Sequence, residues 1–173
     1  MNEAMKNLLT RRSVRKYKPE QITDEELRAV LGAGTYAPTA RGTQSPLIVA
    51  VQNAEDIALM SRLNAAVWGR ADFDPFFGAP TVVVFAQAGN VNGVQDASLV
   101  MGNLLNAAHA LGLGSCWINR AREVFEMPEG KALLKKWGVE GDWVGVGNCI
   151  LGYADGPEPK PAPRRPDYYR IIK

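Results

Sequence analysis

One segment of the sequence strongly limits the folds that the chain can adopt. Residues 97–111 contain no Asp, Glu, Lys or Arg, and their clearly polar side chains are one serine, two asparagines and His109. A helix that is apolar on nearly every face has to be covered on nearly every face. A chain of 173 residues rarely surrounds a helix so completely, so we expect a central helix packed on its counterpart in a homodimer. Burial inside one chain is the alternative.

Short apolar runs and helical patterns alternate along the rest of the chain. The expected strands are residues 47–51, 81–85, 115–118 and 144–153. Further helices are expected after the capping box of Thr23 and Glu26, after Asn53, and over residues 122–125 and 129–137. Gly112 is expected to end the central helix in a left-handed conformation. No internal repeat is visible, and we expect one domain over residues 1–173.

The composition excludes several classes of protein. Apolar residues make up 46% and charged residues 22% of the chain, which is typical of a folded globular protein and not of a disordered one. The net charge of +2 argues against an extended nucleic-acid-binding surface. Two cysteines and one histidine cannot complete a closed zinc site or a cysteine-held iron–sulfur cluster, so no metal is expected. Cys116 and Cys149 are expected to be buried thiols of a reducing compartment.

The sequence also gives no signal for secretion or membrane insertion. Residues 1–12 include Glu3 and lack the apolar core of a signal peptide. No run approaches the roughly 18 apolar residues that a membrane span needs. We therefore expect a cytoplasmic protein without a membrane partner.

The strongest chemical signal lies in residues 11–18. Five of these eight residues are cationic, and Ser13 lies among them. Guanidinium groups bind phosphate oxygens in a bidentate manner, and a hydroxyl can complete the shell of the anion. A second basic cluster, residues 160–165, lies in a proline-rich tail whose extended backbone can aim long side chains at low entropic cost. We interpret the two clusters as one phosphate-binding site, and a solvated basic surface is the alternative.

Four motifs together resemble the FMN-dependent nitroreductase-like flavoproteins. They are residues 11–17 (RRSVRKY), 37–46 (APTARGTQSP), 112–118 (GLGSCWI), and Gly152-Tyr153 followed by Lys160 and Arg164-Arg165-Pro166. Each motif alone is modest, whereas the order and spacing of the four are specific and cover nearly the whole chain. The resemblance implies an α+β fold with a central mixed β-sheet flanked by helices. It also implies an intertwined homodimer with FMN at the subunit interface and an extended C-terminal tail, residues 154–173, docked on the partner subunit.

The resemblance further assigns cofactor-binding positions along the chain. These are Arg11, Arg12, Ser13, Arg15, Thr39, Arg41, Gln44, Trp117, Ile118, Asn119, Lys160, Arg164 and Arg165. Arg15 would lie near the pyrimidine edge of the flavin, and Lys160 with Arg164 or Arg165 would close the phosphate site. The loop that carries Thr39 and Gln44 would approach the cofactor in part from the other subunit.

Several other residues allow more than one interpretation. Trp68, Phe73, Phe76 and Phe77 are either core residues or a lid that holds a planar substrate against the flavin. His109 is expected to be an interface or core histidine, and not a catalytic acid.

The implied activity is that of an NAD(P)H-dependent FMN oxidoreductase. Electrons would pass from NADH or NADPH to a small, planar, electron-poor acceptor, a nitroaromatic or a quinone, by a ping-pong mechanism. No catalytic side chain is required, because N5 of the flavin carries the hydride. Two alternatives stay open: a reductase of the same fold that is specialised for dehalogenation or enone reduction, and a flavin-binding protein without enzymatic activity.

Overall fold

The computed structural model describes residues 1–173, except for the side chains of residues 81–83. The strands are β1 (Leu47–Val51), β2 (Thr81–Gln87), β3 (Gly114–Ile118) and β4 (Trp143–Gly152). The helices are α1 (Glu3–Thr10), α2 (Asp24–Thr35), α3 (Ala54–Trp68), α4 (Gly93–Ala110), α5 (Ala121–Glu126) and α6 (Pro128–Lys136), with a 3-10 helix, η1, at Ala40–Gly42. All four predicted strands are present. The α1 helix is an addition to the sequence-based expectation, and the central helix begins four residues before its uncharged segment.

The sheet has the strand order β1-β2-β4-β3, and every neighbouring pair of strands is antiparallel. The expectation of a mixed sheet is met only by an isolated parallel bridge between Ser13 and Ser115, where the N–H of Val14 donates to the carbonyl of Ser115 at 3.0 Å. Apolar runs predict strands but not their direction, because direction depends on how the intervening helices return the chain. The bridge between Ser13 and Ser115 places the N-terminal segment along the β3 edge of the sheet.

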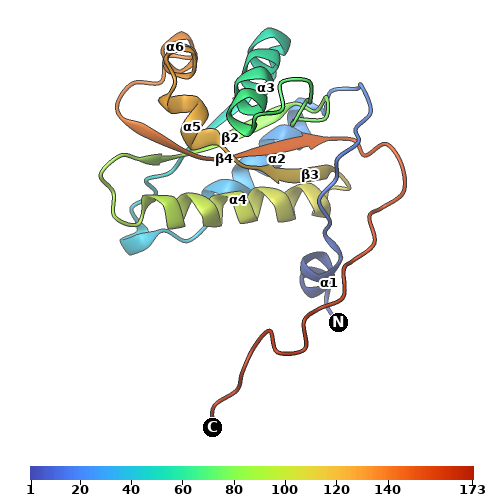
Figure 1. Cartoon of the computed structure of the whole chain (residues 1–173). Helices are drawn as coiled ribbons and strands as arrows, with labels where there is room; N and C mark the ends of the chain where they lie inside the picture. The colour runs from blue at the N-terminus through green and yellow to red at the C-terminus, as the bar shows by residue number, and fades with distance from the viewer.

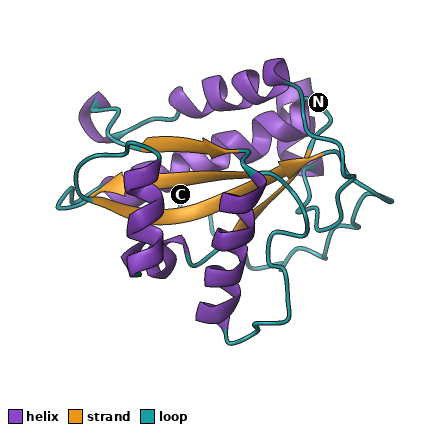
Figure 2. Cartoon of the chain, turned by 90° about the horizontal axis from the view of Figure 1, so that it is seen from above, coloured by secondary structure: helices purple, strands orange, loops and turns teal.

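Helices cover both faces of the sheet, as an α+β fold requires (Figures 1 and 2). The α3, α5 and α6 helices lie on one face, and α2 and α4 lie on the other. Alternate residues of β4 point to opposite faces, so Ile150 packs in the core beneath α5 while Cys149 and Leu151 pack beneath α4. The prediction of buried, free thiols is confirmed for Cys116 and Cys149.

The predicted helix ends are confirmed by their hydrogen bonds. Thr23 Oγ1 accepts from the N–H of Glu26 at 3.2 Å, and Glu26 Oε2 accepts from the N–H of Thr23 at 2.9 Å, which completes the capping box. Asn53 Oδ1 accepts from the N–H of Asp56 at the start of α3. Gly112 has a φ of +76°, as a left-handed residue after α4 should.

The α4 helix is not fully covered within one chain. Its buried residues face the sheet and α2, whereas Val94 and Leu99 are 52% and 49% exposed. Burial inside a single chain, the alternative for this helix, is therefore wrong. No helix in the described part of the chain is long and apolar enough to cross a membrane.

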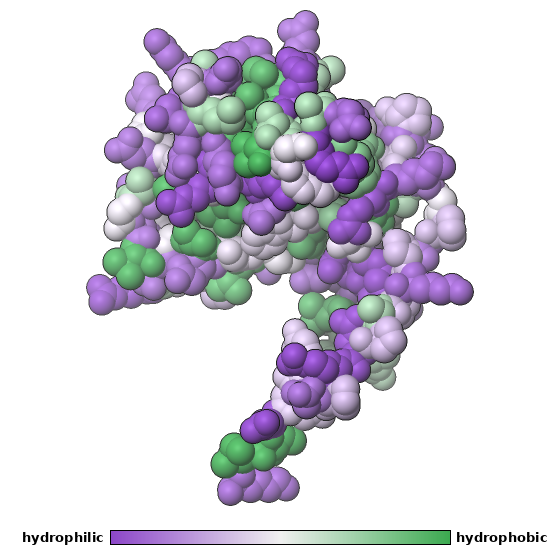
Figure 3. Space-filling model, in the orientation of Figure 1, coloured by the Kyte–Doolittle hydropathy of each residue, from purple (hydrophilic) through white to green (hydrophobic). Residues whose placement is uncertain are grey.

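Two other segments expose apolar side chains. The α1 helix has no buried residue, and Met5, Leu8 and Leu9 are each about half exposed. The tail after residue 155 extends away from the body of the molecule (Figures 1 and 3), and its apolar end includes Tyr169 and Ile172, which are 76% and 89% exposed. Each of these segments, like the open side of α4, therefore leaves apolar side chains uncovered in the single chain.

Candidate functional site

The basic segment at residues 11–13 lies along the β3 edge and contains buried nitrogen atoms without partners. Arg12 Nη1 donates to the carbonyls of Leu9 and Arg11 at 2.9 and 2.7 Å. Arg11 Nη1 and Arg12 Nε are buried and have no hydrogen-bond partner in the described part of the chain. A buried donor of a charged group without an acceptor costs free energy, which a bound anion would relieve. The segment therefore fits a phosphate group.

A cavity of about 360 Å³ lies between this segment and the beginning of the tail. Its lining includes Arg12, Arg15, His109 and residues 157–159. The chain thus brings two of the predicted cationic residues to one cavity and places the start of the proline-rich tail beside them.

The basic residues of the tail lie elsewhere. Lys160, Arg164 and Arg165 are exposed. The Arg164 guanidinium donates to the carbonyl of Ala162 at 3.1 and 2.8 Å, and Arg165 pairs with Asp167 at 3.1 Å. The tail that carries these residues extends away from the body of the molecule (Figure 1) and is exposed to solvent.

The predicted positions on β3 divide between the two faces of the sheet. Trp117 packs with the core beneath α4 and rests on Gly147, where an added Cβ would come within 2.6 Å of the indole Nε1. Ile118 packs in the opposite core, and Asn119 is exposed directly after the strand. The end of β3 therefore presents backbone groups, and not a cluster of catalytic side chains.

Asn64 is a candidate cofactor-binding residue that the sequence reasoning missed. It lies on α3, is fully buried, and donates from Nδ2 to the carbonyl of Asn119 at 2.8 Å. Its Oδ1 is buried without a hydrogen-bond partner among the described residues. The signal that could have found it is an asparagine four positions after Met60, a spacing that places it on the buried face of the helix. A free, buried acceptor beside β3 fits a ligand that carries an N–H group.

The loop with Thr39, Arg41 and Gln44 lies at the other end of α4. Arg41 and Gln44 have positive φ angles of 56° and 50°. The N–H of Ala40 donates to Oδ1 of Asp96 in the first turn of α4 at 3.0 Å, so this side chain anchors the loop there.

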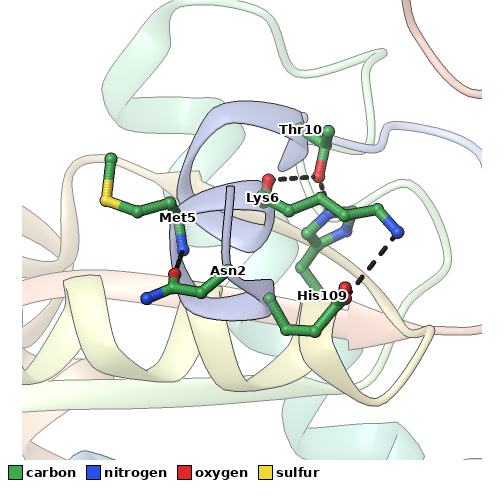
Figure 4. Close-up of polar contacts among 6 residues, drawn as sticks. Asn2, Met5, Lys6, Thr10 and His109 are labelled. Atoms are coloured by element: carbon green, nitrogen blue, oxygen red, sulfur yellow. Dashed lines mark hydrogen bonds and ion pairs between the residues drawn. The ribbon is translucent and has the colours of Figure 1, made fainter.

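The opposite end of α4 carries His109. Its Nε2 shares a hydrogen bond of 2.8 Å with Thr10 Oγ1 of α1 (Figure 4). This contact joins α1 to α4 near the basic segment. The 18 residues of α4 span about 27 Å. Within one chain, the loop and residues 11–13 are therefore far apart.

The four candidate lid residues do not behave alike. Phe76 is 1% exposed and belongs to the core between the sheet and α3. Trp68, Phe73 and Phe77 form an edge-to-face series with ring centroids 5.4 and 5.5 Å apart, and Trp68 is 41% exposed. Phe76 thus has the position of a core residue, while the other three stay candidates for a surface that contacts substrate.

The fold is α+β, with an antiparallel sheet between two helical layers and a basic segment on its β3 edge. The chain belongs to the nitroreductase family, whose model matches residues 8–153, so the resemblance inferred from the four motifs is confirmed. It is 33% identical over 157 residues to an Archaeoglobus fulgidus protein that carries the name NADH dehydrogenase/NAD(P)H nitroreductase, covering 88% of this chain and 86% of that protein.

Two further comparisons agree with this family. An NADPH-flavin oxidoreductase of Vibrio harveyi is 28% identical, with 93% of this chain and 70% of that protein covered. The crystal structure of a Bacteroides fragilis nitroreductase with bound FMN is 27% identical, covers both chains completely and superposes with a TM-score of 0.91. The α+β nitroreductase fold implied by the resemblance is therefore confirmed.

Proposed function

We propose that this protein is an FMN-dependent oxidoreductase that takes electrons from NADH or NADPH and passes them to a small, planar, electron-poor acceptor in a ping-pong cycle. The Bacteroides fragilis structure with FMN and the Vibrio harveyi flavin oxidoreductase support the cofactor and the donor. The observation that carries the proposal is the set of unpartnered buried atoms along β3: two guanidinium nitrogens, on Arg11 and Arg12, and the Asn64 oxygen.

These atoms match the two ends of FMN in chemical character. The guanidinium nitrogens, with the hydroxyl of Ser13, would bind the phosphate as donors. Asn64 Oδ1 would accept from the ring N–H of the flavin beside residues 117–119. Ser13 pairs with Ser115, and four residues of extended strand from there to Asn119 span about 13 Å. Donors and acceptor are thus separated along one strand, as an elongated ligand requires.

When bound, FMN supplies hydride acceptance and donation at N5. The residues of the chain would bind and orient the cofactor and would stabilise its negative charge. Arg12 and Arg15 supply positive charge at the cavity, which favours the more negative reduced state of a bound flavin. Burial raises the pKa of the Cys149 thiol, so this cysteine stays protonated and supplies no nucleophile.

We also infer that two chains complete each cofactor site. An α4 helix packed antiparallel on its counterpart about a two-fold axis would cover Val94 and Leu99. The same packing would carry the partner's loop, with Thr39, Arg41 and Gln44, from the far end of α4 to this chain's basic segment. The tail would then dock on the partner subunit, which would bury its apolar end and bring Lys160 with Arg164 or Arg165 to the phosphate.

The visible absorbance spectrum of the purified protein tests this function directly. We expect flavin bands near roughly 370 and 450 nm that bleach when NADH or NADPH is added without oxygen. Bound flavin that neither nucleotide reduces would support a flavin-binding protein without this activity. A colourless protein that takes up no added FMN would refute the proposal.

A further inference from the structure

Two arginine side chains lie against one exposed aromatic cluster close to Asn119. The guanidinium carbon of Arg120 lies 4.8 Å from the centroid of the Trp68 ring. The guanidinium carbon of Arg70 lies 5.2 Å from the centroids of both Trp68 and Phe73. A guanidinium at such a distance is attracted to the ring face. The indole of Trp68 is therefore in contact with two guanidinium groups.

Neither guanidinium has a negative partner in the part of the chain whose side chains are described. By contrast, Arg122 pairs with Glu126 at 3.0 Å only two residues after Arg120. Asp74 in the same aromatic segment is already engaged, because its carboxylate accepts from the Ser61 hydroxyl at 2.6 Å and from two backbone N–H groups. Two like charges without a counterion create a local positive potential that attracts anions.

The backbone holds Arg120 in a conformation that disfavours residues with a Cβ. Its φ and ψ are 72° and 13°, in the left-handed region. The carbonyl of the preceding Asn119 accepts from Asn64 Nδ2 at 2.8 Å and from Asn148 Nδ2 at 3.5 Å, which fixes the chain just before the strained residue. Strained residues that their surroundings hold in place are found preferentially at functional sites. Arg120 thus combines a strained backbone with a charge that has no counterion among the described side chains. It also lies close to Asn64, the residue proposed to bind the flavin.

We propose that Arg70 and Arg120 form a subsite that binds a carboxylate on the electron acceptor. This inference rests on the proposed function, because it places the subsite at the end of β3 where Asn64 would contact the flavin. A guanidinium binds a carboxylate through two parallel hydrogen bonds. Stacking on Trp68 restricts both guanidinium groups before the substrate arrives, which lowers the entropic cost of binding. The substrate class is an electron-poor aromatic compound that carries a carboxylate.

A pair of matched acceptors tests this specificity in the flavin-loaded protein. The probes are 4-nitrobenzoate and its uncharged analogue 4-nitrobenzamide, each reduced with NADH. We expect the wild-type protein to have the higher kcat/KM for 4-nitrobenzoate. In the variant with both Arg70→Gln and Arg120→Asn, the ratio of kcat/KM for 4-nitrobenzoate to kcat/KM for 4-nitrobenzamide should be about tenfold smaller. The reason is that each lost hydrogen bond to a charged group weakens binding substantially. Its kcat/KM for 4-nitrobenzamide should stay unchanged.

The variants are chosen to separate binding from folding. Asparagine tolerates the left-handed conformation better than other residues with a side chain, and Arg70 is exposed, so both changes leave the fold in place. Arg122→Gln is the matched control, because it removes a nearby cation that already pairs with Glu126. This control should keep the full preference for 4-nitrobenzoate.

A redox-inert probe gives a second readout that does not depend on turnover. Benzoate titrated by calorimetry should bind the wild-type protein, and its Kd should weaken about tenfold in the double variant. Higher ionic strength should also weaken this binding, because salt screens a partly exposed charge pair. Benzamide should show neither dependence.

Each failure has a distinct signature. An equal preference for the two nitro compounds in the wild-type and double-variant proteins would overturn the subsite. Variants that raise only the KM for NADH or NADPH would also overturn it, since the arginines would then bind the phosphates of the donor. Absence of NAD(P)H oxidation with every acceptor would refute the proposed function instead, whereas weaker benzoate binding in the double variant would still support the subsite.

Discussion

Replacing Asn64 with leucine should weaken FMN binding while leaving the empty protein nearly as stable as before. The buried Oδ1 without a partner costs the FMN-free protein about 1–3 kcal/mol. Asn64→Leu removes this cost, and it also removes the hydrogen bond to the carbonyl of Asn119, which contributes about 1 kcal/mol. The two changes oppose each other in the FMN-free protein. In the complex, the acceptor for the flavin N–H is lost, so the Kd for FMN should rise about tenfold, or about 1.4 kcal/mol.

Flavin fluorescence during titration of FMN into the FMN-free protein measures this Kd, and urea unfolding followed by circular dichroism measures stability. The control is Asn53→Ala at the N-cap of the same helix, which should cost about 1 kcal/mol of unfolding free energy without changing the Kd. An unchanged Kd in a folded Asn64→Leu protein would refute the assignment of Oδ1 to the cofactor.

Three further predictions concern the phosphate, the interface and the acid stability. Arg11→Ala combined with Ser13→Ala should lose FMN during dialysis with the fold intact, and unchanged flavin content would exclude these residues from the phosphate site. Leu99→Asp should convert the proposed dimer to a monomer in sedimentation experiments and release FMN, because the charge would lie on the open face of α4; a dimer that persists would contradict the proposed packing. Hydrogen bonds from Lys136 and Trp137 lower the pKa of Asp56 below its ordinary 3.8, so its ionised form stabilises the fold above pH 3.8, and this contribution is lost as the pH falls through the lowered value. Asp56→Asn should therefore unfold about 2 kcal/mol more easily at pH 7, and urea titrations at pH 7 and pH 3 should show a smaller difference between the two proteins at pH 3.

Much of the local structure follows from the sequence, because its causes are local. The capping box at Thr23 needs only the residues of one helical turn, and the left-handed end at Gly112 needs only the absence of a Cβ. The same holds for the motifs that identify the family, since residues 11–17 and 112–118 each form one continuous segment. The basic segment could thus be predicted to be a phosphate site without knowing what surrounds it.

The tertiary structure decided everything that depends on contacts between distant segments. The antiparallel order of the sheet, and the burial of Phe76 apart from the other aromatic residues, depend on how helices pack on the strands. The separation of Thr39 from the basic segment by the length of α4 is likewise invisible in the sequence.

The site itself shows the same division. Arg11 could be proposed from its neighbours in the chain. Asn64 and Arg120 became candidates only through folding: among the described side chains, the buried Asn64 oxygen has no hydrogen-bond partner, and Arg120 lies on Trp68 without a counterion. Sequence determines which polar groups are available. Whether such a group is satisfied or left free for a ligand depends on the groups that the fold brings within hydrogen-bond distance of it.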